Sequence, residues 1–298
     1  TNGWIPTLDK TVEDVPSKAN TEGIFGFGYT DDYVSMTNLV SNAGVVASDV
    51  TGVGSIRYAL AACEYGGDKG IFGFGSDGDN VSMTNLVSNT GVVASDVTGV
   101  GTARYGPAGC SYGEDKGIFA FGSSGGYVTL TNLVSNAGVV ASDGAGAGTA
   151  RYYLAGCEYG GDKGIFAYGH VSAAVVSMSN LVSNAGVVAT DTTGVGTDRY
   201  SPGGCSYGED KGIFGFGYDF STYWSVTNLV SNVGVVSSDV TGVGTVRRRV
   251  GACEYGKDKG IFGYGDTSSN FSMTNLVSNA GVVASDVTGV GSARNRLG

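Results

Sequence analysis

The most reactive side chains of this 298-residue chain are five cysteines that recur 47 or 48 residues apart. Each stands alone at the same place in a repeated stretch. A disulfide requires two Cα atoms about 4.4–6.8 Å apart, and a zinc site requires ligands that converge on one point. We expect equivalent positions of neighbouring repeats to lie too far apart for either. The sequence therefore predicts no metal site and five free cysteines that act as small core residues, at Cys63, Cys110, Cys157, Cys205 and Cys253.

Acidic and basic side chains recur with the same period, which raises the question of repeated calcium sites. Calcium takes about six to eight oxygen ligands, and one Asp beside one Lys in each repeat supplies too few. We instead predict Asp–Arg pairs within or between repeats, and Asn side chains that hydrogen-bond to a bend in the third strand. The repeated positions are Asp49, Asp96, Asp143, Asp191, Asp239 and Asp286; Arg57, Arg104, Arg151, Arg199, Arg247 and Arg294; Lys69, Lys116, Lys163, Lys211 and Lys259; and Asn38, Asn85, Asn132, Asn180, Asn228 and Asn275.

His170 is the only histidine. A histidine that acts as a general acid or activates a nucleophile needs an acidic residue to orient it and a nucleophile beside it. The sequence around His170 offers no recognisable pair of this kind. We expect a protein that is not an enzyme and holds no cofactor.

The elements that position these side chains are six copies of one repeat. Gly-Ile-Phe recurs at residues 23, 70, 117, 164, 212 and 260. A period near 47 made of short apolar runs and glycine turns is typical of blade repeats. In the copy over residues 61–104, the runs 61–65, 70–75, 81–87 and 92–96 predict four antiparallel strands. The sequence therefore predicts an all-β, six-bladed β-propeller, and a β-helix or open solenoid is the alternative.

The sequence contains six copies of the second, third and fourth predicted strands but only five clear copies of the first strand. A ring of this kind needs one terminus to complete the blade that the other begins. We expect residues 1–22 to form an N-terminal arm that closes the ring of residues 23–298. Residues 4–8 or 11–15 are the candidates within the arm, and residues 294–297 compete with them.

The stretch RYALAACEYGGDKGIFGFG, residues 57–75, resembles kelch-type propeller repeats: an Arg, a strand of small residues, then an apolar strand that ends in Gly. Phe-Gly or Tyr-Gly stands where kelch repeats have a double glycine. The sequence motifs DKGIFGFG and NLVSN also resemble those of repeat proteins of phages, cyanophages among them. This resemblance implies a virion or extracellular attachment protein and carries no catalytic residues.

The copies differ mainly in two places, the loop between strands two and three and the lead into strand one. In an up-and-down blade both places emerge on the same face, so we predict a variable recognition face opposite a uniform one. Aromatic side chains there suit sugar stacking or protein contact, and the Asp side chains suit polar contacts or a weak cation. The predicted ligand-binding residues are Tyr29, Asp31, Asp32, Tyr33, Asp77, Asp79, Asn80, Tyr127, His170, Tyr218, Phe220, Tyr223 and Trp224.

Net charge and apolar patterning exclude several classes of partner. The formal charge of −10 and the absence of a basic stripe disfavour nucleic acid. No apolar run reaches the roughly 18 residues of a membrane span, so we expect no membrane insertion. The expected partner is a glycan or protein surface receptor, or neighbouring structural subunits. A propeller glycoside hydrolase or lyase and a purely architectural protein are the alternatives.

Overall fold

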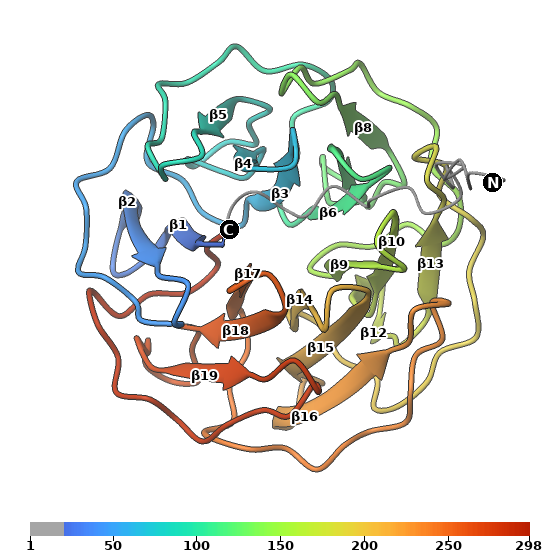
Figure 1. Cartoon of the computed structure of the whole chain (residues 1–298). Coiled ribbons are helices and arrows are strands. Elements are labelled where there is room, and N and C mark those ends of the chain that lie inside the picture. The colour runs from blue at the N-terminus through green and yellow to red at the C-terminus, as the bar shows by residue number, and fades with distance from the viewer. Residues whose placement is uncertain (1–20) are drawn as a thin grey trace, which may run out of the picture.

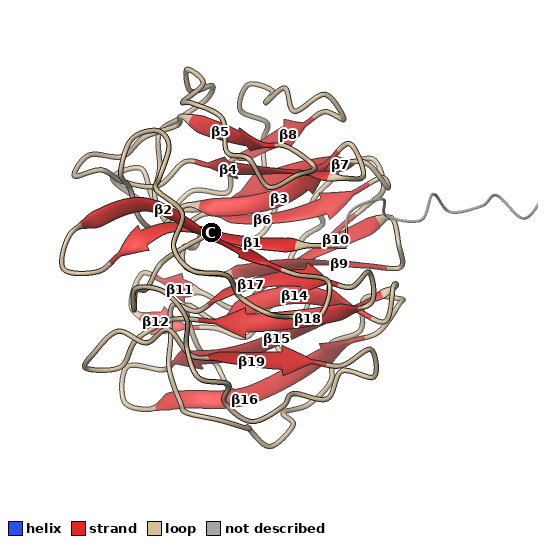
Figure 2. Cartoon of the chain, turned by 60° about the vertical axis from the view of Figure 1, so that its left-hand side comes forward, coloured by secondary structure: helices blue, strands red, loops and turns tan. Residues whose placement is uncertain are grey.

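The computed structural model describes residues 21–298, which form an all-β structure without a helix. Small antiparallel sheets follow one another around a common centre, in chain order (Figure 1). Seen from the side, their strands lie in layers stacked one above another (Figure 2). We number the repeats as units 1–6 by their Gly-Ile-Phe sequences. The all-β prediction is confirmed.

Units 2–6 each contain a three-stranded sheet in which the second strand lies between the first and the third. Unit 1 has a sheet of two strands, the second and the third. The first strands are β3 (Ala61–Tyr65), β6 (Ala108–Tyr112), β9 (Ala155–Tyr159), β14 (Gly203–Tyr207) and β17 (Gly251–Tyr255). The second strands are β1 (Gly23–Tyr29), β4 (Lys69–Gly73), β7 (Lys116–Ala120), β10 (Lys163–Ala167), β15 (Lys211–Tyr218) and β18 (Lys259–Gly263). The third strands are β2 (Tyr33–Val40), β5 (Thr84–Val87), β8 (Thr131–Val134), β13 (Ser179–Val182), β16 (Tyr223–Val230) and β19 (Thr274–Val277). Unit 4 also has a small hairpin, formed by β11 (His170–Val171) and β12 (Ala174–Val175).

The regular pairing of each second strand is interrupted by a buried aromatic residue with a left-handed backbone. In unit 2, Phe74 has φ 64° and is fully buried, and Gly75 follows with φ 105°. A non-glycine residue in this region is uncommon and costs about 1 kcal/mol or more, so the surrounding contacts must hold it in place. The same conformation recurs in every unit, at Phe27, Phe74, Phe121, Tyr168, Phe216 and Tyr264.

The predicted fourth strand is wrong as a continuous strand. The run after each Ser-Asn turn meets the third strand only at isolated bridges, Val87 with Val93 and Thr84 with Val97 in unit 2. Between these bridges, the Asn85 side-chain amide donates to Ala94 O and to Asp96 Oδ1, at 3.0 and 2.8 Å. The Asn85 side chain takes the place of backbone hydrogen bonds between the two segments. The repeated Asn therefore interrupts the strand pairing that the bridges on either side of it begin.

Six backbone hydrogen bonds close a circle near the centre of the molecule. Each repeat contributes one residue that has a left-handed backbone and lies just before its first-strand position. The amide of this residue donates to the carbonyl of the equivalent residue in the previous repeat. All six N···O distances lie between 2.7 and 3.2 Å. The sixth bond runs from Ala59 N to Arg296 O, so the last repeat meets the first. The members are Ala59, Gly106, Tyr153, Ser201, Arg249 and Arg296.

The C-terminal residues lie against β1, close to the centre (Figure 1). Asn295 exchanges two backbone hydrogen bonds with Tyr29, and Gly298 exchanges two with Gly26. This is the pairing that the equivalent Tyr58 and Ala61 make in unit 2. The structure therefore supports the competing prediction that residues 294–297 join the ends. The predicted arm falls mostly on residues 1–20, outside the described residues.

Candidate binding face

The two variable places of the sequence meet at one end of the sheets. Backbone bridges join the lead into strand one to the loop after strand two, for example Tyr152 to His170 and Tyr200 to Tyr218. At the other ends of the strands, the Gly-Asp-Lys and Ser-Asn turns contact each other, as in the 3.0 Å bond from Asn136 Nδ2 to Asp115 Oδ2. We call the first end the variable face and the second the constant face. The prediction that both variable places share a face is confirmed.

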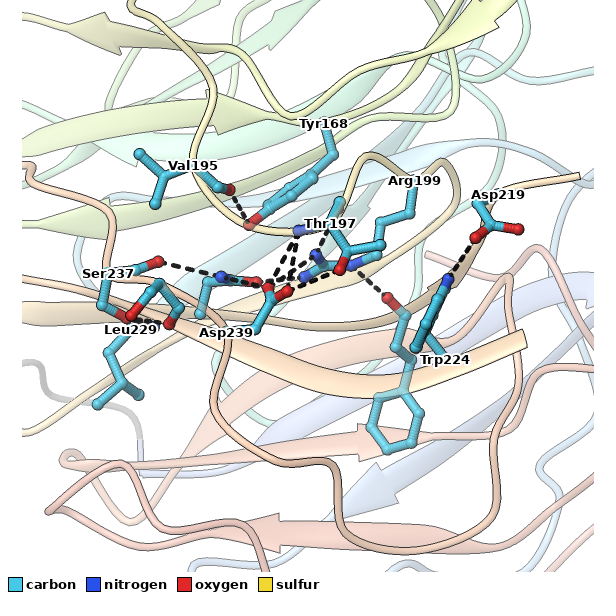
Figure 3. A network of polar contacts seen from close by, with 12 residues as sticks. Tyr168, Val195, Thr197, Arg199, Asp219, Trp224, Leu229, Ser237 and Asp239 are labelled. Carbon is cyan, nitrogen blue, oxygen red and sulfur yellow. Dashed lines mark hydrogen bonds and ion pairs between the residues drawn. The ribbon is translucent and has the colours of Figure 1, made fainter. Parts of the chain in front are cut away.

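A repeated polar network holds neighbouring units together beneath the variable face (Figure 3). Arg199 donates to Phe216 O at 2.7 Å, to Thr197 O at 3.0 Å and to Asn228 Oδ1 at 2.7 Å. Its guanidinium also lies 3.9 Å from the centre of the Tyr168 ring of the previous unit, and 3.9 Å from Asp239 Oδ1. Equivalent contacts recur at all six repeated arginines.

Burial acts against both charges of this network. Burial lowers the pKa of Arg104 to about 10, which still leaves the guanidinium charged at neutral pH. Burial would raise the pKa of Asp96, but hydrogen bonds from Asn85 and Ser55 outweigh it, and the pKa lies below its usual value. All six arginine side chains are fully buried. The repeated Asp, Asn and Arg residues are therefore structural, as predicted from their number and spacing.

Nine aromatic rings from units 3–5, and from the linker segments that lead into them, form one connected group on the variable face. At its centre, His170 lies 5.2 Å from the Phe220 ring and 5.1 Å from the Tyr152 ring, measured between ring centres. Tyr127 stacks on Tyr152 at 5.0 Å. Phe220 is 48% exposed, so solvent or a ligand reaches the group from outside. We call this the large aromatic cluster: Tyr105, Tyr127, Tyr152, Tyr153, His170, Tyr200, Tyr218, Phe220 and Tyr223.

Arg248 adds a cation to one side of this cluster. Its guanidinium lies 4.7 Å from the Tyr218 ring centre and donates to Tyr200 Oη at 2.6 Å. Asp266 balances it at 3.5 Å and also accepts a 3.1 Å bond from Arg249. Burial raises the pKa of Asp266 despite these two arginines. Arg248 and Arg249 therefore form local ion pairs with Asp266, and Arg248 also supplies a cation–π contact of the kind that binding sites use.

The remaining predicted residues lie apart from the large aromatic cluster. Tyr33 stacks on Tyr58 at 4.8 Å, and Tyr29 lies beside both, which makes a small aromatic cluster near units 1 and 2. Asn80 donates to Ser123 O at 3.1 Å, so it ties one loop to the next. The predicted acidic residues lie in exposed loops, at Asp31, Asp32, Asp77 and Asp79.

Trp224 takes part in the structure of its own loop. Its indole Nε1 donates to Asp219 Oδ2 at 2.9 Å (Figure 3). The other oxygen of Asp219 accepts from Ser221 and Thr222. The indole is half-buried. Trp224 therefore fixes the loop that presents Phe220, which makes it a supporting residue of the cluster.

The surroundings of His170 are aromatic. Tyr127 Oη lies 3.2 Å from its Nδ1, and Tyr152, Tyr200 and Phe220 surround the ring. Burial lowers the pKa of His170, so the neutral form predominates at pH 7. A neutral imidazole packed among rings contributes flat surface to the cluster.

The five cysteines are free, and burial raises the pKa of each. Thiols with raised pKa values are poor nucleophiles and poor metal ligands. Within residues 21–298 no group of three His, Cys, Asp or Glu side chains could hold a metal ion. The expected weak cation site at the acidic loops finds no such group there.

Sequence reasoning missed four of the nine rings of the large aromatic cluster, and Arg248 beside it. Tyr105, Tyr152, Tyr153, Tyr200 and Arg248 lie in the variable lead into strand one, outside the predicted ligand-binding set. The available signal was a tyrosine that recurs at this place in four repeats and gives way to Arg248 in the fifth. This signal can be interpreted only when the segment before each first strand is paired with the loop after the second strand of the same unit.

Comparison with known proteins leaves the chain without an assigned family. No family model matches the sequence, and no curated protein matches it either. The chain is a β-rich repeat protein, and residues 21–298 include no helix that could cross a membrane.

Proposed function

We propose that this chain is a six-bladed, kelch-like β-propeller that recognises a glycan or a protein receptor through its variable face. The circle of six backbone hydrogen bonds and the meeting of the last repeat with the first support the ring. Closed rings leave few free strand edges, which suits a stable scaffold for variable loops. By the resemblance of its repeats to phage proteins, we place it in a virion or outside the cell.

The large aromatic cluster with Arg248 carries this proposal. Flat rings with polar tips stack on sugar faces and fill protein pockets at low entropic cost, and they concentrate at binding hot spots. Aromatic neighbours around His170 favour binding over catalysis, which supports a non-enzymatic role.

A glycan array probed with the labelled protein tests the proposal. Phe220→Ala removes the most exposed ring and should abolish binding while leaving the melting temperature nearly unchanged. Tyr33→Ala, in the small aromatic cluster, and Val233→Ala, a 70% exposed valine beside a Ser-Asn turn, are the matched controls and should bind normally. Turnover of chromogenic glycosides by the wild-type protein would contradict the non-enzymatic role.

One observation favours an architectural alternative. Six valines at one repeated position, directly after the Ser-Asn turns, are 63–66% exposed. Repeated apolar side chains on a ring suit assembly with neighbouring subunits. Ordered oligomers in sedimentation experiments, dispersed by Val92→Asp and Val187→Asp together, would support this alternative over receptor binding.

A further inference from the structure

A cavity of about 80 Å³ lies inside the circle of six backbone hydrogen bonds, at the variable face. All six members of the circle line this cavity, and so does the residue that follows each of them in the chain. The following residues are buried and apolar, so they contribute no polar side chain. The chemistry of the cavity therefore depends on the side chains of the six members. We call this space the circle cavity.

The side chains of the circle divide the wall of the cavity into a small-residue half and a polar half. Ala59 and Gly106 are neighbours in the circle and carry at most a methyl group. The other four members also follow one another, since each donates its backbone amide to the member before it. The polar half consists of Tyr153, Ser201, Arg249 and Arg296. Two guanidinium groups and two hydroxyl groups are thus gathered at one side of the circle cavity.

The polar half carries more positive charge than its surroundings neutralise. Arg249 donates to Asp266 Oδ2 at 3.1 Å, and Arg248 lies 3.5 Å from the same oxygen. Within residues 21–298, the Arg296 side chain makes no hydrogen bond or ion pair, and its guanidinium lies 5.0 Å from the Tyr58 ring centre. Burial lowers the pKa of Arg249, and the charge of Arg296 lowers it further, against the opposite effect of Asp266. An anion in the cavity would relieve the repulsion between the two lining arginines.

Buried donors without partners gather at the same half of the wall. Within residues 21–298, Ser201 Oγ and the Nε atoms of Arg249 and Arg296 have no hydrogen-bond partner. Ser201 is only 5% exposed, and a buried polar atom left unpaired is costly. Burial raises the pKa of Tyr153 to about 12, although the two arginines lower it, so its hydroxyl stays a donor at neutral pH. Among the described residues, no Asp, Glu, Asn or Gln side chain lines the cavity.

We infer that the circle cavity binds one oxyanion substituent of a glycan, a carboxylate or a sulfate, in contact with Arg249 and Arg296. The inference rests on the proposed function and specifies its ligand as an acidic glycan. The planar fork of a guanidinium matches two oxygens of either group, and the hydroxyl groups of Tyr153 and Ser201 supply further donors. The small-residue half of the wall leaves room for the bond that joins the substituent to its sugar.

Continuity with the large aromatic cluster favours a glycan as the carrier of this anion. The Tyr153 ring lines the cavity and lies 4.6 Å from the Tyr152 ring of the cluster, measured between ring centres. A sugar ring can therefore stack on the cluster while its charged substituent enters the cavity. A single substituent suits the site better than a polyanion, because the chain carries a formal charge of −10 and exposed acidic loops.

Small anions test the cavity without a glycan. The full-length, isotope-labelled protein is titrated with sodium glucuronate, sodium sulfate or glucose at constant ionic strength, and the Nε–Hε signals of its arginines are followed by NMR. Glucuronate or sulfate should move two of these signals saturably and raise the melting temperature, whereas glucose should do neither. Arg296→Met should remove one signal and weaken binding at least about tenfold, because a bidentate contact is lost.

Arg296→Met should stay folded, because the circle bonds of residue 296 come from its backbone. Lys257→Met removes an equal charge from an exposed turn of the constant face; it is the matched control and should bind normally. Failure of the wild-type protein to bind either glucuronate or sulfate would overturn the inference. Equal anion binding by Arg296→Met and the wild type would overturn it as well.

Oligosaccharides of one backbone that end in glucuronate, in a sulfated sugar or in a neutral sugar then test the carrier. The acidic members should bind at least about tenfold more tightly than the neutral one, and Arg296→Met should remove this preference. Equal binding of the neutral member, unchanged by Arg296→Met, would overturn the inference and leave the proposed function standing. Glucuronate binding without binding of any glycan would contradict the proposed glycan ligand and would assign the cavity to a carboxylate of a protein partner.

Discussion

Two neighbouring arginines show how the constant network and the variable face differ. Arg247 and Arg248 are consecutive, and each guanidinium lies over an aromatic ring, at 4.2 Å from Phe216 and 4.7 Å from Tyr218. Arg247 is fully buried and donates to Tyr264 O and Asn275 Oδ1. The Arg248 side chain is 16% exposed and pairs with groups of the variable face. The same residue type therefore fixes the scaffold at one position and shapes a surface at the next.

The largest expected effect comes from removing the buried member of this pair. Arg247→Met should lower the free energy of unfolding by about 3–5 kcal/mol, because Asp286 loses its ion pair and Asn275 its donor. Arg248→Met should cost only about 1 kcal/mol, since Asp266 keeps Arg249. Chemical denaturation of the two variants measures the difference. Equal losses would contradict the division between scaffold and surface.

The constant network should also set the acid stability of the protein. Burial would raise the pKa of Asp143, but bonds from Thr102 and Asn132 outweigh it and hold it below the usual value. A depressed folded-state pKa contributes stability that is complete above the unfolded pKa, about 3.9, and is lost as the pH falls through the folded pKa. Because six equivalent carboxylates share this shift, we expect a steep loss of melting temperature below about pH 4. Asp143→Asn should make that loss shallower.

A matched glycine pair tests the tight contact between units. Gly117→Ala would press a methyl group against Cys63 and should destabilise the protein by roughly 1–3 kcal/mol. Within residues 21–298, a methyl group on Gly70 would make only ordinary contacts, with Val87 and Cys63 O at 3.6 Å or more, so Gly70→Ala should change stability by less than about 1 kcal/mol. Thermal unfolding compares the two directly. A comparable loss at Gly70 would show that the contact with the cysteine does not cause the difference.

The smallest expected effect lies on the variable face. Burial lowers the pKa of His170, so the unfolded chain binds its proton first as the pH falls below about 6.5. The stability due to the neutral ring is lost from there down to the folded pKa. His170→Gln should remove this slope between about pH 6.5 and the folded value, with little change at pH 7.5. An unaltered pH dependence of the melting temperature would show that His170 does not titrate separately.

The sequence predicted those features that depend on local pattern. The period of the units follows from Gly-Ile-Phe, and the second strands follow from alternation and turn residues. The free cysteines follow from their spacing, and the shared face of the variable places follows from the up-and-down order of strands. In each case a residue type and its spacing suffice. Repetition strengthens the inference, because six copies must satisfy the same constraints at once.

The tertiary structure decided how side chains are shared between neighbouring segments. Asn85 looked like part of a strand bend, yet its amide replaces ladder bonds and prevents a fourth strand. Trp224 looked like a ligand contact, yet Asp219 holds it in its own loop. Residues 294–298 pair with β1, 266 or more residues away in the chain (295 − 29 = 266). Spacing along one chain does not reveal which donor pairs with which acceptor between distant segments. Such partners depend on three-dimensional proximity and on the cost of leaving a buried polar group unpaired.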